Sequence, residues 1–322
     1  MIHKRIAIFY GYFSTSNVRG DERRQSRQAS FGNGCQHRRS HFDKDYGHWN
    51  AHKYKSKPMK KIFTLGKIGE NSVNEDAALL TDEVLAVSDG AGGGGLYAEK
   101  WSRYLLEKLP KTPLTSADDL DNWIDGIWQP FYDECETAAK QQGGLTLQKF
   151  YDEGSFATLA AVWKVSDTQC KWLTYGDSVV FCYNKKTDVL EYSISGLMEF
   201  NNPPYLINFL DKIKPEGVKM GSFEISNDSV LIVASDALSL YILMRYMLSH
   251  NALYATELQR AAAASTKNSN YIRAAQSLPK IDFYTDVIKN FFLSDYNLTR
   301  HLTRLYKDGL IALDDYSVVA NG

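Results

Sequence analysis

One stretch constrains the fold more than any other part of the chain: Glu83 to Gly95, with the sequence E-V-L-A-V-S-D-G-A-G-G-G-G. A short apolar run, Val84 to Val87, ends at Ser88 and Asp89, and glycines follow. This order is typical of a buried strand that brings a carboxylate to the end of a sheet before the chain turns sharply. Glycine lets the backbone approach an ion or a phosphate closely because it has no Cβ. The stretch therefore predicts an acidic site at the end of a strand.

The distribution of charge divides the chain into two parts. Residues 1–61 contain 14 Lys and Arg against 4 Asp and Glu, although the whole chain of 322 residues has a net charge of -1. Residues 1–58 are rich in Arg, Ser, Gln, His and Gly without periodicity, so they cannot bury enough apolar surface to offset the entropy of ordering. We therefore expect a disordered basic tail or a misassigned extension over 1–58 and a folded domain over 59–322. A nucleic-acid or anionic-surface arm stays open as an alternative for the tail.

The hydrophobic pattern changes along residues 59–322. Strands are predicted first, followed by two helices, more strands, further helices and one final strand. Consecutive strands with short connections favour antiparallel sheets, and the helices are separate from them in sequence, so the pattern predicts an α+β fold. Three of the predicted helices are Leu96–Leu109, Ala117–Gln142, in which Pro130 is a point for a kink or a break, and Phe283–Lys307 as one continuous helix.

The cysteines and the apolar runs bear on the compartment. The four cysteines include no Cys-x-x-Cys pair, which favours reduced thiols in a cytoplasmic protein over disulfides or a zinc site. No apolar run reaches the roughly 18 residues of a membrane-spanning helix, so we expect no membrane partner. The five histidines of the tail have no regular ligand spacing, so we expect no metal site there. The residues concerned are Cys35, Cys135, Cys170 and Cys182, and His3, His37, His41, His48 and His52.

Acidic residues recur at strand ends. In addition to Asp89, acids open or close three other predicted strands, at Asn74-Glu75-Asp76, at Ser235-Asp236 and at Asp314-Asp315. Taken singly, an aspartate at such a position is usually a turn residue or a helix cap. If the strand ends converge, however, four or five carboxylates lie in one patch.

Such a patch of carboxylates favours divalent metal ions. Carboxylates this close repel one another strongly unless they are protonated or neutralised by cations. Hard ions with oxygen ligands are the natural neutralisers, which points to Mg²⁺ or Mn²⁺. Two such ions about 3.5–4 Å apart could bridge a water molecule, lower its pKa and direct it at phosphorus. No His or Cys is near these acids in sequence and no Gly-Lys-Ser/Thr follows the glycines, so zinc, cysteine and P-loop chemistry fit poorly.

Six short motifs occur in an order that matches a known family. They are Asn74-Glu75-Asp76, Val87 to Gly93, Gly154 to Thr158, Tyr175 to Ser178, Ala234 to Leu238 and Asp314 to Ser317. This series resembles the motifs of the PPM (type 2C) family of metal-dependent Ser/Thr protein phosphatases, and the resemblance runs from about Lys61 to Val319.

The resemblance implies a fold, an activity and a partner. The implied fold is a four-layer α/β/β/α sandwich of two antiparallel sheets flanked by helices. The implied activity is hydrolysis of phosphoserine and phosphothreonine by a water molecule that bridges two Mn²⁺ or Mg²⁺ ions, with a weaker third ion beside them. The expected partner is a phosphoprotein substrate made by a Ser/Thr kinase, and we expect no nucleic-acid partner.

Carried over position by position, the resemblance assigns roles to the acids. Asp89 would bridge both metal ions, and the carbonyl of Gly90 would join a metal shell. Asp177 would help to hold the weaker third ion. The implied metal ligands are Glu75, Asp76, Asp89, Gly90, Asp177, Asp236 and Asp314, and the implied catalytic residues are Asp89, Asp76 and Asp236.

Several positions depart from the family. The family's phosphate-gripping Arg, three residues before the Asn, is Asn71 here, and Lys67 is a candidate to replace it, although a lysine lacks a bidentate fork. Ala91 stands where many members have a His general acid, and Asp315 replaces an Asn. Lys67 and Asn71 are therefore the predicted substrate-binding candidates. The departures leave one alternative function open, a pseudophosphatase that keeps the fold and acts as a binding module.

Overall fold

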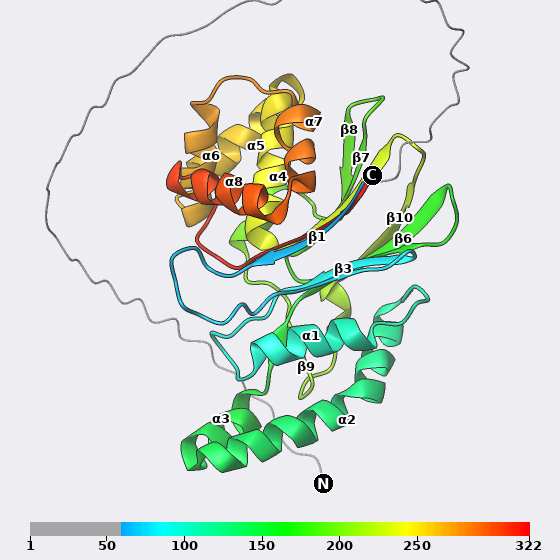
Figure 1. Cartoon of the computed structure of the whole chain (residues 1–322), viewed down its shortest axis with the longest axis vertical. Helices are drawn as coiled ribbons and strands as arrows, with labels where there is room; N and C mark the ends of the chain where they lie inside the picture. Colours follow the sequence, from blue (N-terminus) through cyan, green and yellow to red (C-terminus); the bar gives the residue numbers. More distant parts are fainter. Residues whose placement is uncertain (1–58) are drawn as a thin grey trace, which may run out of the picture. The chain divides into compact units, whose positions relative to one another are not determined.

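Two five-stranded antiparallel sheets lie at the centre of residues 59–322, the part of the chain that the computed structural model describes (Figure 1). The strand order is β1-β12-β11-β7-β8 in the first sheet and β10-β6-β5-β3-β2 in the second, and β4 pairs with β9 apart from both. The strands are β1 (Lys60–Leu65), β2 (Ala77–Leu80), β3 (Val84–Ser88), β4 (Phe156–Ala157), β5 (Leu159–Lys164), β6 (Gln169–Tyr175), β7 (Val179–Asn184), β8 (Val189–Tyr192), β9 (Ile207–Asn208), β10 (Val218–Glu224), β11 (Ser229–Ala234) and β12 (Tyr316–Asn321).

The last strand of the chain completes the first sheet. β12 pairs antiparallel with both β1 and β11, and Val318 lies opposite Phe63 while Val319 lies opposite Val233. The residues just before β12 are therefore held beside the beginning and the middle of the folded sequence. This pairing brings Asp314, two residues before β12, to the same end of the sheet as Asp236, two residues after β11.

Helices cover the outer face of each sheet (Figure 1). Trp101 and Phe131, from the helices that follow β3, share an apolar cluster with Leu159 of the second sheet. Leu243 and Leu302, from the later helices, do the same with residues of the first sheet. The helices are α1 (Ala98–Lys108), α2 (Ala117–Gln142), α3 (Gly144–Glu153), α4 (Asp236–Ser249), α5 (Asn251–Ala263), α6 (Lys267–Gln276), α7 (Phe283–Asp286) and α8 (Asp295–Lys307), with 3₁₀ turns η1 (Leu197–Asn201), η2 (Pro215–Gly217) and η3 (Ile288–Phe292).

A third apolar cluster lies between the two sheets. Val87 and Val162 contribute to it from the second sheet, and Val180 and Val233 contribute from the first. Three successive core layers therefore separate helices, sheet, sheet and helices. The predicted α+β fold with four layers is confirmed.

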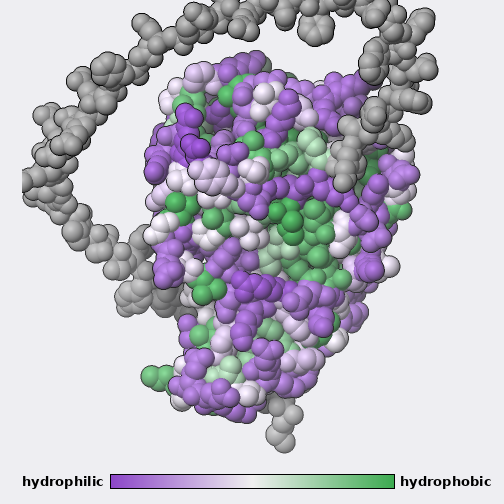
Figure 2. Space-filling model, viewed as in Figure 1, coloured by the Kyte–Doolittle hydropathy of each residue, from purple (hydrophilic) through white to green (hydrophobic). Residues whose placement is uncertain are grey.

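The layers explain where polar and apolar residues lie on the surface. On the face drawn in Figure 2, hydrophilic residues cover most of the helical layers, and an apolar area lies over the middle, where Figure 1 places the sheets. α8 shows the reason, because Leu298, Leu302 and Leu305 turn inward and are buried. Its remaining, largely polar side chains face outward, as in any amphipathic helix that packs on a sheet.

The structure corrects one predicted helix and adds two. Residues Phe283–Lys307 are not one continuous helix but α7, η3 and α8. The side chain of Ser294 accepts a hydrogen bond from the N–H of Asn297 and so starts α8 as a new helix. α2 runs unbroken through Pro130. The unpredicted helices are α3 and α6.

The predictions on the cysteines, the basic tail and membrane spans have different outcomes. Cys135, Cys170 and Cys182 are buried and free, in line with reduced thiols. The proposed tail over 1–58, with its histidines and Cys35, lies outside the described residues. Among residues 59–322, every helix is too short or too polar to cross a bilayer.

Candidate active site

Asp89 is held in place by its backbone. It follows β3, whose five residues are all buried. The N–H of Thr158 donates to the carbonyl of Asp89 at 2.8 Å, and the N–H of Asp89 donates to the Thr158 hydroxyl at 3.1 Å. The same hydroxyl lies 2.9 Å from the hydroxyl of Ser178, which follows Asp177. The motifs at 154–158 and 175–178 therefore position Asp89 and Asp177 together.

Gly90 and Gly92 are required by close contacts with Glu75. Gly90 bridges to Ala157, and a Cβ on Gly90 would lie 2.5 Å from the carbonyl oxygen of Glu75 and 2.8 Å from that of Ala98. At Gly92 a Cβ would collide with the Glu75 carboxylate, which accepts a hydrogen bond from the Gly92 N–H at 3.3 Å. The glycine-rich turn thus packs directly on the segment that carries Glu75 and Asp76.

Replacing Gly90 by Ala is expected to lower the free energy of unfolding by about 1–3 kcal/mol, because the new methyl group meets backbone atoms that cannot move aside easily. Gly93→Ala is the matched control, since a Cβ at Gly93 has nothing within 4 Å. Urea unfolding of the two variants checks this prediction. Equal stabilities would contradict the close packing of the glycine-rich turn on Glu75.

Asp76 is the most deeply buried of the predicted acids. Its N–H donates to the side chain of Asn74 at 2.9 Å, which fixes the start of β2. Both carboxylate oxygens are buried, and within residues 59–322 no hydrogen bond of normal geometry reaches them. Burial raises the pKa of Asp76 to about 7, although the hydroxyls of Ser317 and Ser235 are near enough to oppose the rise. A buried carboxylate without partners is costly unless a cation or a proton neutralises it.

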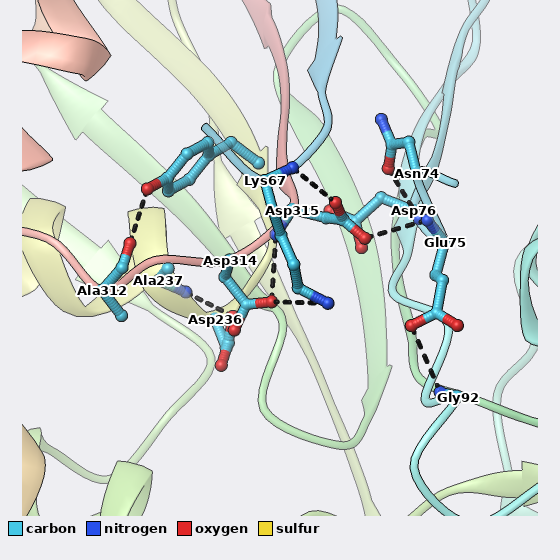
Figure 3. Close-up of polar contacts among 11 residues, drawn as sticks. Lys67, Asn74, Glu75, Asp76, Gly92, Asp236, Ala237, Ala312, Asp314 and Asp315 are labelled. Carbon is cyan, nitrogen blue, oxygen red and sulfur yellow. Dashed lines mark hydrogen bonds and ion pairs between the residues drawn. The ribbon is translucent and has the colours of Figure 1, made fainter. Parts of the chain in front are cut away.

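Asp236 and Asp314 are placed by the pairing of β11 with β12. The N–H of Ser235 donates to the carbonyl of Ser317 at 3.0 Å, and the N–H of Ser317 donates to the Ser235 hydroxyl at 2.9 Å. Asp236 is the first residue of α4, and its carboxylate accepts from the N–H of Ala237. Figure 3 shows Asp236 and Asp314 pointing into the same region, where Lys67 also lies.

The acids act on one another electrostatically. Burial raises the pKa of Asp89 well above its usual value, and the nearby charges of four other aspartates raise it further. Burial and three of these aspartates also raise the pKa of Asp236. Burial raises the pKa of Asp177 to about 6, and Asp314 adds to this rise. We call this group the acidic cluster: Asp76, Asp89, Asp177, Asp236 and Asp314.

Lys67 lies beside the acidic cluster, whereas Asn71 does not. Nζ of Lys67 is 3.9 Å from Oδ1 of Asp314. Burial lowers the pKa of Lys67, but the carboxylates of Asp315, Asp314 and Glu75 more than offset this and raise it. Asn71 is exposed in the loop before β2. Of the two substrate-binding candidates, only Lys67 is therefore near the acids.

Two residues near the cluster have positions to which the sequence did not assign a role. Asp315 is buried, and its carboxylate accepts hydrogen bonds from the N–H of Lys67 at 3.0 Å and of Glu75 at 2.9 Å. It therefore joins the segments before β2 to the start of β12 (Figure 3). Lys219 of β10 is half-buried, pairs with Glu199, and lies near enough to Asp177 for attraction to oppose the lowering of its pKa by burial. The doublet Asp314-Asp315 was a signal for the first, but a lone lysine in a strand gave none for the second.

The donor set fits hard divalent ions held partly through water. Among residues 59–322, no three Asp, Glu, His or Cys side chains are close enough together to enclose an ion directly. The acidic cluster nevertheless offers only oxygen donors, and both oxygens of Asp76 are buried without a partner. Mg²⁺ usually keeps several of its waters, so carboxylates that bind it through water are spaced more widely than direct ligands. A donor set made of oxygen atoms alone suits Mg²⁺ or Mn²⁺ better than zinc, which favours Cys and His ligands.

Comparisons with known proteins give likenesses in structure only. No protein-family model matches the chain, and no curated protein matches it. It is similar to Ser/Thr phosphatase Stp1 from Staphylococcus aureus, at 15% identity and a TM-score of 0.46, over 83% of this chain and 95% of that one. It is similar to the catalytic domain of Ser/Thr protein phosphatase PstP in complex with two manganese ions, at 14% identity and a TM-score of 0.45, over 82% and 97%.

A further similar structure is PppA, a regulatory component of T6SS in Pseudomonas aeruginosa, at 14% identity and a TM-score of 0.44, over 83% of this chain and 97% of that one. With TM-scores below 0.5, these likenesses add nothing to the case for an activity, which rests on the acidic cluster. In fold, the chain is similar to bacterial Ser/Thr phosphatases, the kind of enzyme that its motifs resemble.

Proposed function

We propose that the protein is a metal-dependent phosphatase that hydrolyses phosphoserine and phosphothreonine in a phosphoprotein. The single observation that carries the proposal is the acidic cluster, in which aspartates from separate strand ends raise one another's pKa. Among the interactions described for residues 59–322, three lysines act on these acids with opposite charge: Lys67 and Lys267 on Asp314, and Lys219 with Asp177. A group of buried carboxylates with so little positive charge nearby would destabilise the fold of a protein that does not bind cations.

Each acid of the site would have a role in holding the metal ions. Asp89, Asp76 and Asp236 would hold two divalent ions together with Asp314, Glu75 and the carbonyl of Gly90, and Asp177 would contribute to a third. Bound Mn²⁺ or Mg²⁺ supplies a nucleophile by lowering the pKa of water, and it stabilises negative charge on phosphate. Ser235 and Ser317 fix the strand ends from which Asp236 and Asp314 project, so the acids need little reordering when ions bind.

Lys67 would take part of the role that a phosphate-binding arginine has elsewhere. Its ammonium group lies 3.9 Å from Asp314, and its side chain is 29% exposed, so it can turn toward an anion at the mouth of the cluster. Lysine is a point charge that binds phosphate without the two parallel hydrogen bonds of an arginine. We therefore infer that Lys67 binds the phosphate group more weakly than the bidentate guanidinium group of an arginine would.

The proposed activity has a direct test. The full chain should release phosphate from a phosphothreonine peptide in the presence of Mn²⁺, and a chelator should abolish the release, because the acids alone repel a phosphate dianion. Phosphate release measured with and without chelator on the same preparation decides the question. A rate that is unchanged by chelator would refute a metal-dependent phosphatase.

One observation favours a second function, a pseudophosphatase that acts as a binding module. The position of the phosphate-binding arginine is occupied by Asn71, which is exposed and lies outside the cluster. Calorimetry would then show Mn²⁺ binding, while no phosphopeptide would be hydrolysed. Turnover of any phosphopeptide well above that of the chelated protein excludes this second function.

A further inference from the structure

A second polar site lies at the far end of α4 from the acidic cluster. It is a cavity of about 590 Å³ between the last turn of α4, the first turn of α5 and the segment that follows α6. α4 begins at Asp236 and reaches this cavity at Arg245, and nine residues of helix span about 14 Å. Figure 1 shows α4, α5 and α6 together in one helical layer. The cavity is therefore separate from the candidate active site.

The cavity is lined by a buried arginine, Arg245, whose Nε has no hydrogen-bond partner in the described part of the chain. Arg245 is only 5% exposed, and its Nε is buried without a hydrogen bond. Within residues 59–322, no carboxylate forms an ion pair with Arg245. Arginine stays charged under all ordinary conditions, and a buried charge without compensation destabilises the fold. An anion in the cavity would remove this destabilisation.

The neighbouring acids do not supply that anion. No Asp or Glu is among the residues that line the cavity. The carboxylate of Asp188 pairs with His250 at 3.2 Å and also accepts from the Tyr183 hydroxyl at 2.7 Å. The carboxylate of Asp286 accepts from the N–H of Asp282 at 2.9 Å. Both of these carboxylates therefore have other partners.

Two further features make the cavity attractive to an anion. The first turn of α5 lines it together with the last turns of α4 and α6, and no side chain caps the N–H groups at the start of α5, so these N–H groups are available to an anion. Lys280 lies at the exposed rim. Apolar side chains, among them Leu248, Leu278 and Ile281, form the rest of the wall.

We propose that this cavity binds a small organic phosphate, with its phosphoryl group on Arg245 and the first turn of α5 and its apolar part against Leu248, Leu278 and Ile281. The cavity has the size of ordinary small-molecule sites, which occupy roughly 300–1,000 Å³. A guanidinium and a helix N-terminus are the groups that proteins most often use for phosphate. The N-terminal segment of this chain is a poor occupant, because residues 1–61 carry 14 basic against 4 acidic side chains.

Binding of phenylphosphonate to the full chain tests the proposal. This probe has a phosphoryl group and an apolar ring, and it cannot be hydrolysed as a phosphate ester. A chelator is present throughout, so that metal ions at the acidic cluster play no part. We expect calorimetric binding in the wild-type protein, about 30-fold or more weaker binding in Arg245→Met, and intermediate binding in Arg245→Lys. Arg260→Met, an exposed arginine on α5, is the matched control and should bind like the wild type.

A measurement on the wild-type protein makes the result independent of how the variants fold. Phenylphosphonate should shift the amide NMR signals of Asn251 and Ala252 in the first turn of α5, whereas benzyl alcohol, which is uncharged, should not. Absence of these shifts, or equal binding by the wild type and a folded Arg245→Met, would overturn the proposal. Equal binding of benzyl alcohol would overturn it as well, because the cavity would then be only an apolar pocket.

Discussion

Replacing Asp89 by Asn is expected to lower the Mn²⁺-dependent hydrolysis of a phosphothreonine peptide more than a hundredfold. Asp89 is the member of the acidic cluster on which all four others act, since each of them raises its pKa in addition to the effect of burial. Removing its charge therefore removes the ligand that interacts with the whole group. A loss of about 3 kcal/mol of transition-state stabilisation suffices for a hundredfold change in rate, and bound metal ions contribute several kcal/mol.

The same substitution should leave the fold intact. The position of Asp89 is fixed by backbone hydrogen bonds with Thr158, and an Asn side chain has the same size. Because the amide carries no charge, repulsion within the cluster falls, and the metal-free variant should be at least as stable as the wild type in urea. Low activity without a loss of stability is thus the expected pair of results.

The matched control for this experiment is Asp82→Asn. Asp82 lies in the turn between β2 and β3, at the opposite end of the hairpin from Asp89, and its side chain is 87% exposed. Its replacement should leave activity unchanged. If Asp89→Asn keeps more than about a tenth of the wild-type rate, Asp89 is not a ligand on which catalysis depends.

The layers of the fold followed from local pattern, but helix boundaries in the last third did not. β3 was predictable because four apolar residues in a row end at Ser88 and Asp89, and this strand is buried throughout. The predicted helix Phe283–Lys307 was wrong because its apolar residues keep helical spacing across Ser294, which in fact caps α8. Periodicity reports which side chains turn inward, and it does not report where hydrogen bonding restarts.

The members of the acidic cluster were predictable from motifs, but the strand pairings and hydrogen bonds that hold them in place were not. Each motif marks a strand end, and strand ends meet only through pairings such as β11 with β12, which sequence alone does not reveal. Asp315 shows the limit most clearly, because its partners are the N–H groups of Lys67 and Glu75. Backbone groups carry no sequence signal, so a carboxylate that binds them looks like any other acid.

The metal-free protein is expected to become less stable as the pH rises from about 6.5 to 8. Burial raises the pKa of Asp76 to about 7 and that of Asp177 to about 6, whereas an aspartate in an unfolded chain titrates near 4. Above pH 4 the folded state therefore holds protons that the unfolded state has lost, so the free energy of unfolding falls with rising pH until the folded state also loses these protons, at about pH 6 for Asp177 and about pH 7 for Asp76. Each pKa unit corresponds to about 1.4 kcal/mol, so the fall from pH 4 amounts to several kcal/mol in total, of which about 1 kcal/mol lies between pH 6.5 and pH 8.

His301 acts in the opposite direction, which determines the pH range of the measurement. Burial lowers the pKa of His301, so folding favours its neutral form. This contribution makes stability rise with pH, but only up to the usual pKa of histidine, about 6.5, where the unfolded state also becomes neutral. Urea unfolding in chelator at pH 6.5 and pH 8 therefore isolates the titration of Asp76 from that of His301.

Mn²⁺ should reverse this dependence on pH. Ligands must be deprotonated to bind a metal ion, so the gain in stability from Mn²⁺ should be larger at pH 8 than at pH 6.5. Asp76→Asn should flatten the fall that the metal-free protein shows, because the amide has no proton to lose in this range, whereas Asp82→Asn should leave it unchanged. A metal-free protein that gains stability between pH 6.5 and 8, or an Asp76→Asn variant with the wild-type pH dependence, would mean that Asp76 is not held as a buried acid among like charges.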